Sequence, residues 1–236
     1  PETQIYDVSN ACLGVLNGMI HVANAIELGQ IKAGLVVSCE SARQIMDFTI
    51  ERLLENKDMD HFKRTVATLT GGSGAVAVLL TEASVSQTGH RLLGGVVRSA
   101  TRHHKLCRWG PDTGIPASGL HVMNTDSVGV LQNGVQLGIE TFNAFCQELG
   151  WTGDALPDKI ICHQVGSSHQ QAILNAIGIP AARDFTTFRY LGNIGSVSLP
   201  LTAAIASERE FLTRGDSVGF LGIGSGLNCL MLGIEW

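Results

Sequence analysis

Short apolar segments alternate with amphipathic helical segments along this chain, and this alternation constrains its fold more than any other feature. In the second half, apolar runs at 159–163 and 217–223 are separated by helical periodicity over 168–177 and 197–212. Short strands that alternate with helices are typical of a mostly parallel sheet with helices on both faces. The sequence therefore predicts an α/β fold built on such a sheet.

The first half follows the same pattern with a more polar helical stretch. Apolar residues recur at helical spacing from Leu13 to Ile26, and Gly29 closes that helix. Residues 99–126 show no clear period, so we expect a linker or a binding loop there, between domains at 1–98 and 127–236. The other expected elements are a strand-like run at 5–8, a buried strand at 34–37, a polar helical stretch at 41–62, strands at 75–80, 92–98 and 229–235, and a helix at 128–149.

Charge and hydropathy exclude several classes of function. Hydrophobic residues make up 44% of the 236 residues and charged residues 16%, against about 25% charged in a typical globular chain, which excludes a disordered chain. The net charge is −5 and no Lys/Arg run exceeds a pair, so we expect no nucleic-acid partner. Apolar runs such as 75–80 are far shorter than the roughly 20 residues that span a bilayer. We therefore expect a cytoplasmic protein without a transmembrane segment.

The cysteine pattern favours free thiols. Six cysteines are spread from Cys12 to Cys229 without a CxxC motif or clustered ligand spacing. In a chain of this size, such spacing indicates neither a disulfide framework nor a zinc site. We predict no metal, and one of the thiols is a candidate for reactivity.

Cys12 is that candidate. It lies in DVSNACLG, where an apolar run ends and an amphipathic helix begins. The N–H groups and the dipole of a helix N-terminus stabilise a thiolate, which favours a nucleophile at this position. A small residue packed between strand and helix is the other interpretation, and the residues alone leave both open.

His163 ends the strand KIICH and precedes a Gly-Ser-Ser turn into the next helix. Because α/β sheets place functional groups at the carboxyl ends of their strands, His163 is a candidate general acid/base or hydrogen-bond donor. A capping or core histidine is the alternative. We assign the remaining histidines, including His169, His103 and His104, to structural roles.

Two glycine-rich segments complete the set of candidates. Asn193 lies in YLGNIGSVSLP, where it is either a functional amide or a turn residue that caps the backbone. The segment FLGIGSGLNC is a glycine-rich turn between apolar strands, in which backbone N–H groups can approach a ligand. It lacks the Lys-Ser/Thr ending of a phosphate loop, and a dinucleotide fingerprint is also missing.

In this order, the cysteine, histidine, asparagine and glycine-rich turn resemble the thiolase-fold condensing enzymes, in particular the ketoacyl-[acyl-carrier-protein] synthase III-like group. The resemblance spans nearly the whole chain. The strings DVSNACLG, ICHQVGSSHQ, YLGNIGSVSLP and FLGIGSGLNCLMLGIEW are most similar to the OleA group, which joins two fatty acyl-CoA molecules in head-to-head olefin biosynthesis. The resemblance implies a thiolase-like fold, layered α-β-α-β-α, that lacks most of its first half upstream of Pro1. Residues 1–98 would then be the remainder of the N-terminal half and 127–236 the C-terminal half.

The resemblance also implies a role for each motif residue. Cys12 matches the nucleophile that takes up an acyl group and releases coenzyme A. His163 and Asn193 match the pair of donors that hold the thioester oxygen of the second substrate as it becomes an enolate. The backbone N–H of Ser225 would join that of Cys12 in an oxyanion hole. Losing one such donor typically costs about 10² to 10³ in rate.

Two positions of this sequence differ from other groups of thiolase-fold enzymes and so favour the synthase III-like group. Asn193 stands where ketoacyl synthases of types I and II have a second histidine, and Ile223 stands where thiolases have a second cysteine. The OleA group takes its proton-removing glutamate from a neighbouring subunit, in a region missing here, so no residue of this chain matches that base. We interpret Glu27, Glu40 and Glu51 as solvated charges at helix and strand ends.

The leading hypothesis is an acyltransferase that joins two long-chain acyl-CoA molecules by non-decarboxylative Claisen condensation. The product is a 2-alkyl-3-ketoacyl compound, formed through an acyl-Cys12 intermediate. The hypothesis implies coenzyme A thioesters as substrates, no cofactor and a homodimer. One alternative is a decarboxylating synthase III that uses malonyl-[acyl-carrier-protein], and another is a non-catalytic acyl-CoA-binding subunit. The residues do not fix the acyl chain length.

Overall fold

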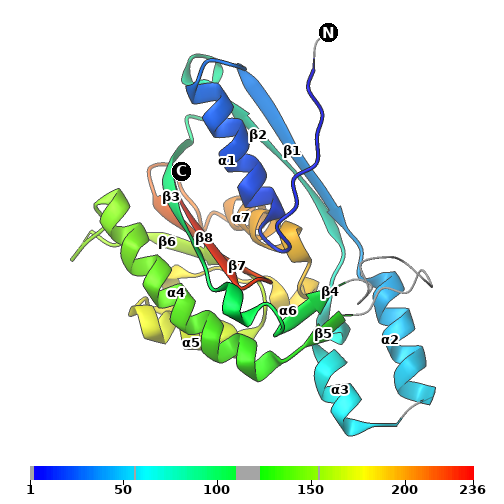
Figure 1. The fold of residues 1–236 in the computed structure, drawn as a ribbon. Coiled ribbons are helices and arrows are strands. Elements are labelled where there is room, and N and C mark those ends of the chain that lie inside the picture. The colour runs from blue at the N-terminus through cyan, green and yellow to red at the C-terminus, as the bar shows by residue number, and fades with distance from the viewer. Residues whose placement is uncertain (1–2, 56, 110–122, 154) are drawn as a thin grey trace.

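The computed structural model describes residues 3–55, 57–109, 123–153 and 155–236, arranged in layers of helices and strands (Figure 1). The main elements, in chain order, are α1 (Gly14–Glu27), β1 (Ala33–Glu40), α2 (Arg43–Glu55), α3 (Met59–Thr65), β2 (Gly74–Thr81), β3 (Arg91–Ser99), β4 (Cys107–Trp109), β5 (Met123–Thr125), α4 (Ser127–Leu149), β6 (Lys159–Cys162), α5 (Ser167–Ile177), α6 (Phe188–Leu191), α7 (Ser198–Glu208), β7 (Ser217–Gly224) and β8 (Asn228–Glu235).

A four-stranded sheet in the order β3-β8-β7-β6 forms the centre of the molecule. Helices α4 and α5 cover one face of this sheet, and α1 and α7 cover the other (Figure 1). A separate two-stranded sheet of β1 and β2 packs on the far side of α1 and α7. The described residues thus form four successive layers: helices, sheet, helices, sheet.

The strand directions differ from the sequence prediction. Strands β6 and β7 are parallel, whereas β7 with β8, β3 with β8, and β1 with β2 are antiparallel. The prediction of a mostly parallel sheet is therefore wrong. The reason is local, because the short turn between β7 and β8 reverses the chain and places β8 antiparallel beside its predecessor.

Strand β8 shows how one sheet serves two hydrophobic cores. Leu230 and Leu232 pack with α1 and α7, whereas Cys229 and Met231 pack with α4 and α5. Successive side chains of a strand point to opposite faces, so burial of both faces requires the continuous apolar sequence that this strand has.

The β1–β2 sheet has one covered and one open face. Val36 and Val78 pack toward α1 and α7. On the other face, Leu35, Val37 and Leu79 are 59%, 64% and 65% exposed. The strand predicted to be buried is therefore buried on one face only, and it runs on to Glu40, whose carboxylate faces the site described below.

The other elements agree with their predicted positions to within a few residues, with two exceptions. The polar stretch at 41–62 is divided into α2 and α3, because Asp58 accepts hydrogen bonds from two N–H groups and starts a new helix. The run at 5–8 forms no strand, and residues 3–9 have no regular secondary structure.

The predicted linker at 99–126 is only partly described, since 110–122 lie outside the described residues. On either side of that gap, β4 and β5 pair antiparallel over three residues each. Within the described ranges, no helix is both long enough and apolar enough to cross a membrane.

Candidate active site

Cys12 lies in a tight turn that leads into α1. The N–H of Leu13 donates to the Asn10 carbonyl at 2.9 Å, and the N–H of Gly14 donates to the Ala11 carbonyl at 3.2 Å. Ala11 has a φ of +44°, in the left-handed region that residues other than glycine seldom occupy. Such strained residues cluster at functional sites. The predicted place of Cys12 at a helix start is confirmed.

The surroundings of Cys12 keep its thiol protonated. Burial raises the pKa of Cys12 to about 12, and the neighbouring Cys107 and Glu40 act in the same direction. The thiol's contact with its own backbone N–H lowers the pKa but does not offset burial. The resting group is therefore a thiol, contrary to the thiolate that the helix start alone predicts.

His163 directly follows β6, at the end of the sheet where the parallel strands β6 and β7 finish. Its backbone N–H donates to the Leu221 carbonyl at 2.9 Å, which fixes it to β7. The side chain is 9% exposed, and its Nδ1 has no hydrogen-bond partner in the part of the chain that is described. Burial lowers the pKa of His163 to about 4, with His169 acting in the same direction. The imidazole is therefore neutral at pH 7 and can accept a proton.

Asn193 is held by both its backbone and its side chain. Its N–H donates to the Thr70 carbonyl at 3.0 Å, and its carbonyl accepts from the Gly72 N–H at 2.8 Å. Its Oδ1 accepts from the Gly195 N–H at 3.0 Å and from Ser198 Oγ at 3.3 Å. Because the amide oxygen is engaged within the turn, the side-chain NH₂ group is the part that can donate to a ligand.

Ser225 lies in the turn between β7 and β8, which is tied to the cysteine turn. Asn228 Nδ2 donates to the Ser225 carbonyl at 3.3 Å and to Asn10 Oδ1 at 2.9 Å. Asn10 in turn donates to Asn17 Oδ1 of α1 at 2.6 Å. This chain of amides fixes the glycine-rich turn relative to the turn that carries Cys12.

Close contacts bring the candidate segments to one end of the sheet. A Cβ on Gly224, the last residue of β7, would lie 3.6 Å from the Cβ of Cys12. A Cβ on Gly14 would lie 3.7 Å from the Cβ of Ser196, in the turn that carries the asparagine. The histidine is bonded to β7 as well. The structure therefore brings together the cysteine turn, the strand-end histidine and the asparagine turn.

Glu40 belongs to the same neighbourhood, although the sequence predicts a solvated charge. Ser196 Oγ donates to Glu40 Oε1 at 2.8 Å, and Ser38 Oγ lies 3.0 Å from Ser196 Oγ. The residue is half-buried and contributes to the raised pKa of Cys12. Its position at a strand end was the only signal in the sequence, and that signal did not distinguish this site from open solvent.

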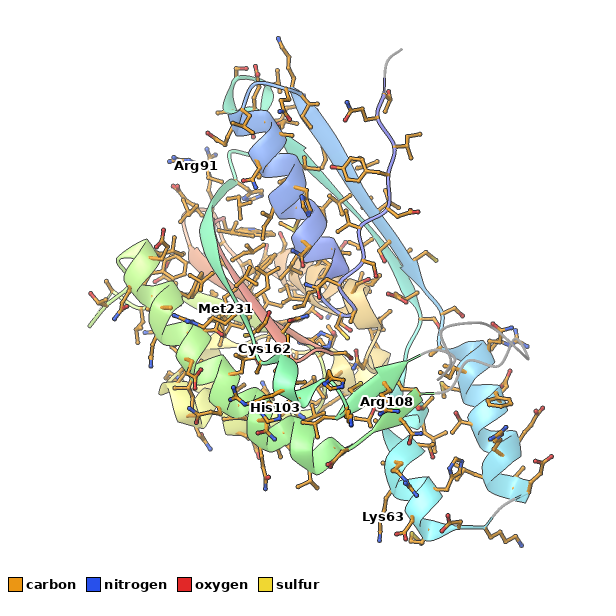
Figure 2. The ribbon with its side chains drawn as sticks, viewed as in Figure 1. Lys63, Arg91, His103, Arg108, Cys162 and Met231 are labelled. Carbon is orange, nitrogen blue, oxygen red and sulfur yellow. The ribbon has the colours of Figure 1, made fainter. Side chains whose placement is uncertain are left out.

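A small cavity of about 50 Å³ opens beside His163, between the sheet and the helices α4 and α5. Apolar side chains provide most of its lining, which includes Cys162 and Met231, close together in the interior of the sheet layer (Figure 2). Gly134 and Gly138 of α4 also line it, and their missing side chains leave this space open.

Asp184 is a buried carboxyl next to the histidine strand. Its Oδ1 accepts from the Cys162 N–H at 3.1 Å, and its Oδ2 accepts from Gln170 Nε2 at 2.7 Å. Burial raises the pKa of Asp184 to about 6, although these hydrogen bonds act against the rise. Among the residues that the structure describes, no group of three or more His, Cys, Asp or Glu side chains could hold a metal ion.

Comparisons with known proteins agree with this geometry. Residues 6–100 match the family model of 3-oxoacyl-[acyl-carrier-protein] synthase III, and residues 146–236 match the model of its C-terminal part. The chain is 52% identical over 238 residues to acyl-CoA:acyl-CoA alkyltransferase of Shewanella oneidensis, covering 100% of this chain and 68% of the relative. It is 38% identical over 232 residues to the protein of the same name from Xanthomonas campestris, covering 98% and 66%.

Solved structures of a relative have the same fold as this chain. A cysteine-to-serine variant of Xanthomonas campestris OleA, with bound lauric acid and lauroyl-CoA, matches with a TM-score of 0.89 and 37% identity. The match covers 98% of this chain and 66% of that one. This likeness confirms the predicted thiolase-like fold, and the chain spans about two thirds of the length of these relatives.

Proposed function

Because the chain belongs to the 3-oxoacyl-[acyl-carrier-protein] synthase III family, we propose that it joins two long-chain acyl-CoA molecules by Claisen condensation without decarboxylation. The relatives named acyl-CoA:acyl-CoA alkyltransferase support this substrate class. The observation that carries the proposal is the meeting of the segments that bear Cys12, His163 and Asn193 at one end of the sheet, with the amide oxygen of the asparagine already engaged.

In the first half-reaction, the sulfur of Cys12 attacks the carbonyl carbon of one acyl-CoA. The thiol proton leaves as the bond forms, and the neutral imidazole of His163 is the base in this site that can take it. The tetrahedral intermediate then collapses, the carbon–sulfur bond to coenzyme A breaks, and the departing sulfur takes up the proton. The products are an acyl-Cys12 thioester and free coenzyme A.

The negative oxygen of that intermediate needs donors. The backbone N–H groups of Cys12 and Ser225 are the proposed oxyanion hole, supported by the contact of Gly224 with Cys12 and by the amide chain that ties the two turns. Because the donors belong to the backbone, their placement depends on the turns and not on the identity of either side chain.

In the second half-reaction, the thioester oxygen of another acyl-CoA accepts hydrogen bonds from His163 and Asn193. A base removes a proton from the carbon next to that thioester, and the resulting enolate attacks the carbonyl carbon of acyl-Cys12. The carbon–sulfur bond to Cys12 breaks, and the proton that the base removed returns to the sulfur, which regenerates the thiol. The product is a 2-alkyl-3-ketoacyl-CoA, with one coenzyme A released per condensation. The resemblance to the OleA group supports a base that a neighbouring subunit supplies.

The remaining parts of the proposal concern assembly and location. We expect a homodimer in the cytoplasm. Residues 1–98 would be the remainder of the N-terminal thiolase-like half, 99–126 a linker or a channel loop, and 127–236 the C-terminal half. No cofactor beyond the coenzyme A of the substrates enters the chemistry.

The test is mass spectrometry of products after the full chain meets one long-chain acyl-CoA with no malonyl donor. We expect the 2-alkyl-3-ketoacyl-CoA, the β-keto acid left when water hydrolyses its thioester, or the ketone that this acid forms by losing carbon dioxide, and none of these products with Cys12→Ser. Release of coenzyme A by Cys12→Ser at the wild-type rate would refute the assigned nucleophile.

The same experiment separates the alternatives. The family name favours a decarboxylating synthase as the second candidate, which would acylate Cys12 and wait for malonyl-[acyl-carrier-protein]. An acyl adduct on Cys12 without condensed product would support it. Reversible acyl-CoA binding with no adduct would support the binding subunit instead.

A further inference from the structure

A line of buried polar side chains runs between the histidine and the asparagine of the site. Its four members are almost fully buried, at 0% to 6% exposure. Two of them lie in the strings ICHQVGSSHQ and YLGNIGSVSLP, but the sequence analysis assigns a role to none of the four. Buried polar groups cost free energy unless they are hydrogen-bonded, so their presence here requires an explanation. We call this line the bridging network, and it consists of Gln164, Thr187, Thr202 and Ser198.

The first half of the bridging network starts next to His163. Gln164 Nε2 donates to the Cys162 carbonyl at 2.6 Å, so this side chain folds back to the residue just before the histidine. Gln164 Oε1 accepts from the N–H groups of Thr187 and Phe188 at 2.8 and 3.1 Å. One amide thus joins the end of β6 to the first turn of α6, the short helix that leads to the asparagine turn.

The second half completes the connection. Thr202 Oγ1 donates to the Ser198 carbonyl at 2.7 Å, which uses its only hydroxyl hydrogen. In the 2.6 Å pair of Thr187 Oγ1 with Thr202 Oγ1, Thr187 is therefore the donor. Ser198 Oγ then donates to Asn193 Oδ1 at 3.3 Å and accepts from the Ile194 N–H at 2.6 Å. The line is continuous from the Cys162 carbonyl, in the peptide that joins Cys162 to His163, to the side chain of Asn193.

We propose that the bridging network is a positioning device, which sets the spacing between the donor atoms of His163 and Asn193 in the condensation step. The inference rests on the proposed function of these two residues. Two donors stabilise one enolate oxygen only when both stand at hydrogen-bond distance from the same point, and an error of about 1 Å can cost 10²-fold in rate. A buried network with each hydroxyl direction fixed holds such a spacing better than apolar packing does.

The proposal distinguishes the two half-reactions. Acylation depends on Cys12, its oxyanion donors and the proton acceptor, whereas enolate formation also depends on the spacing of two side chains. Breaking the network should therefore slow condensation much more than acylation. A merely structural role would lower stability and leave the ratio of the two rates unchanged.

Thr202→Val tests this with little change in shape, because it removes the hydroxyl and leaves the size of the side chain. Thr202→Ser keeps the hydroxyl. Thr141→Val is the matched control, because Thr141 is also 0% exposed and also donates to the carbonyl four residues earlier, at 2.7 Å, but lies in α4 outside the network. For each variant, the burst of coenzyme A released on acylation and the rate of condensed product are measured with one long-chain acyl-CoA, together with the KM and the melting temperature.

For Thr202→Val, we expect the condensation rate to fall 10- to 100-fold, with acylation and KM within about threefold of wild type. Thr202→Ser should recover most of the loss, and Thr141→Val should lower the melting temperature with both rates within about twofold. Gln164→Met combined with Thr202→Val should cost no more than the worse single change, because both break the same line.

An unchanged ratio of condensation to acylation in Thr202→Val, or no recovery in Thr202→Ser, would overturn the positioning role. Wild type that condenses only with a malonyl thioester would overturn the proposed function instead. The ratio is then measured with that donor, whose enolate needs the same two side chains.

Discussion

The close contact between Gly72 and the asparagine turn predicts how a single methyl group would displace Asn193. A Cβ added at Gly72 would lie 1.8 Å from the Leu191 carbonyl oxygen, and both groups belong to backbone. Gly72→Ala therefore requires the two segments to separate by roughly 1.5 Å before ordinary contact is restored. The hydrogen bond from the Gly72 N–H to the Asn193 carbonyl lies in the same place and has to move with them.

A displacement of this size predicts a selective loss of rate. We expect condensation to fall about 10²-fold, equivalent to about 2.7 kcal/mol of transition-state stabilisation, because one donor leaves its position. Acylation of Cys12 should change less, since the cysteine turn approaches the asparagine turn at Ser196 and not at Leu191. The assay is the same burst and product measurement, accompanied by circular dichroism to confirm that the variant folds.

Two further glycines, together with Gly72, form a series in which an added Cβ meets progressively closer neighbours. At Gly14 an added Cβ meets neighbours at 3.6 and 3.7 Å, which is ordinary contact, and at Gly74 it meets side-chain ends at 3.2 and 3.3 Å. Condensation should therefore decline in the order Gly14→Ala, Gly74→Ala, Gly72→Ala. A folded Gly72→Ala variant that condenses within twofold of wild type would refute the reasoning.

Two other predictions concern stability. The raised pKa of Asp184 gives stability that is present below about pH 4 and is lost as the pH rises through about 6. The lowered pKa of His163 gives stability that is present above about pH 6.5 and is lost as the pH falls through about 4. Because the two oppose each other, Asp184→Asn should lose about 2 kcal/mol relative to wild type as pH falls from 7 to 4, measured by urea unfolding, and parallel pH profiles would contradict this. A Cβ on Gly138 would lie 2.6 Å from Ile173 Cδ1, so Gly138→Ala with Ile173→Val should be more stable than the single changes add up to, by about 1 kcal/mol. Thermal unfolding of the two single variants and the double variant tests this prediction, and strictly additive changes in stability would argue against this contact.

Much of the architecture could be predicted because it depends on local periodicity. The apolar spacing from Leu13 to Ile26 gives α1 almost residue by residue, and the strand-end position of His163 follows from a short apolar run before a Gly-Ser-Ser turn. The directions of the strands could not be predicted in this way. Strand β3 pairs with β8, and no local pattern specifies a partner so far along the chain.

The site was predictable in its residues but not in its electrostatics. The glycines around Asn193 indicate a turn, yet the availability of its NH₂ group depends on Ser198 and on Gly195, which engage the oxygen. Similarly, the helix start favours a Cys12 thiolate, whereas burial raises its pKa. Glu40 resembles any strand-end charge until Ser196 is seen to bind it. Such effects arise from segments that meet only after folding.

The pairing of β3 with β8 has a consequence for how quickly the sheet can be completed. Arg91 and Glu235, which pair at one end of the two strands, are 144 residues apart. At typical synthesis rates of 5 to 20 residues per second, β3 leaves the ribosome about 7 to 30 s before its partner exists. Helices α1 and α4 can form within microseconds, but the central sheet has high contact order and must wait. During that interval an apolar strand edge is open to other chains, so the yield of folded protein should depend on chaperones and on temperature more than the local sequence suggests.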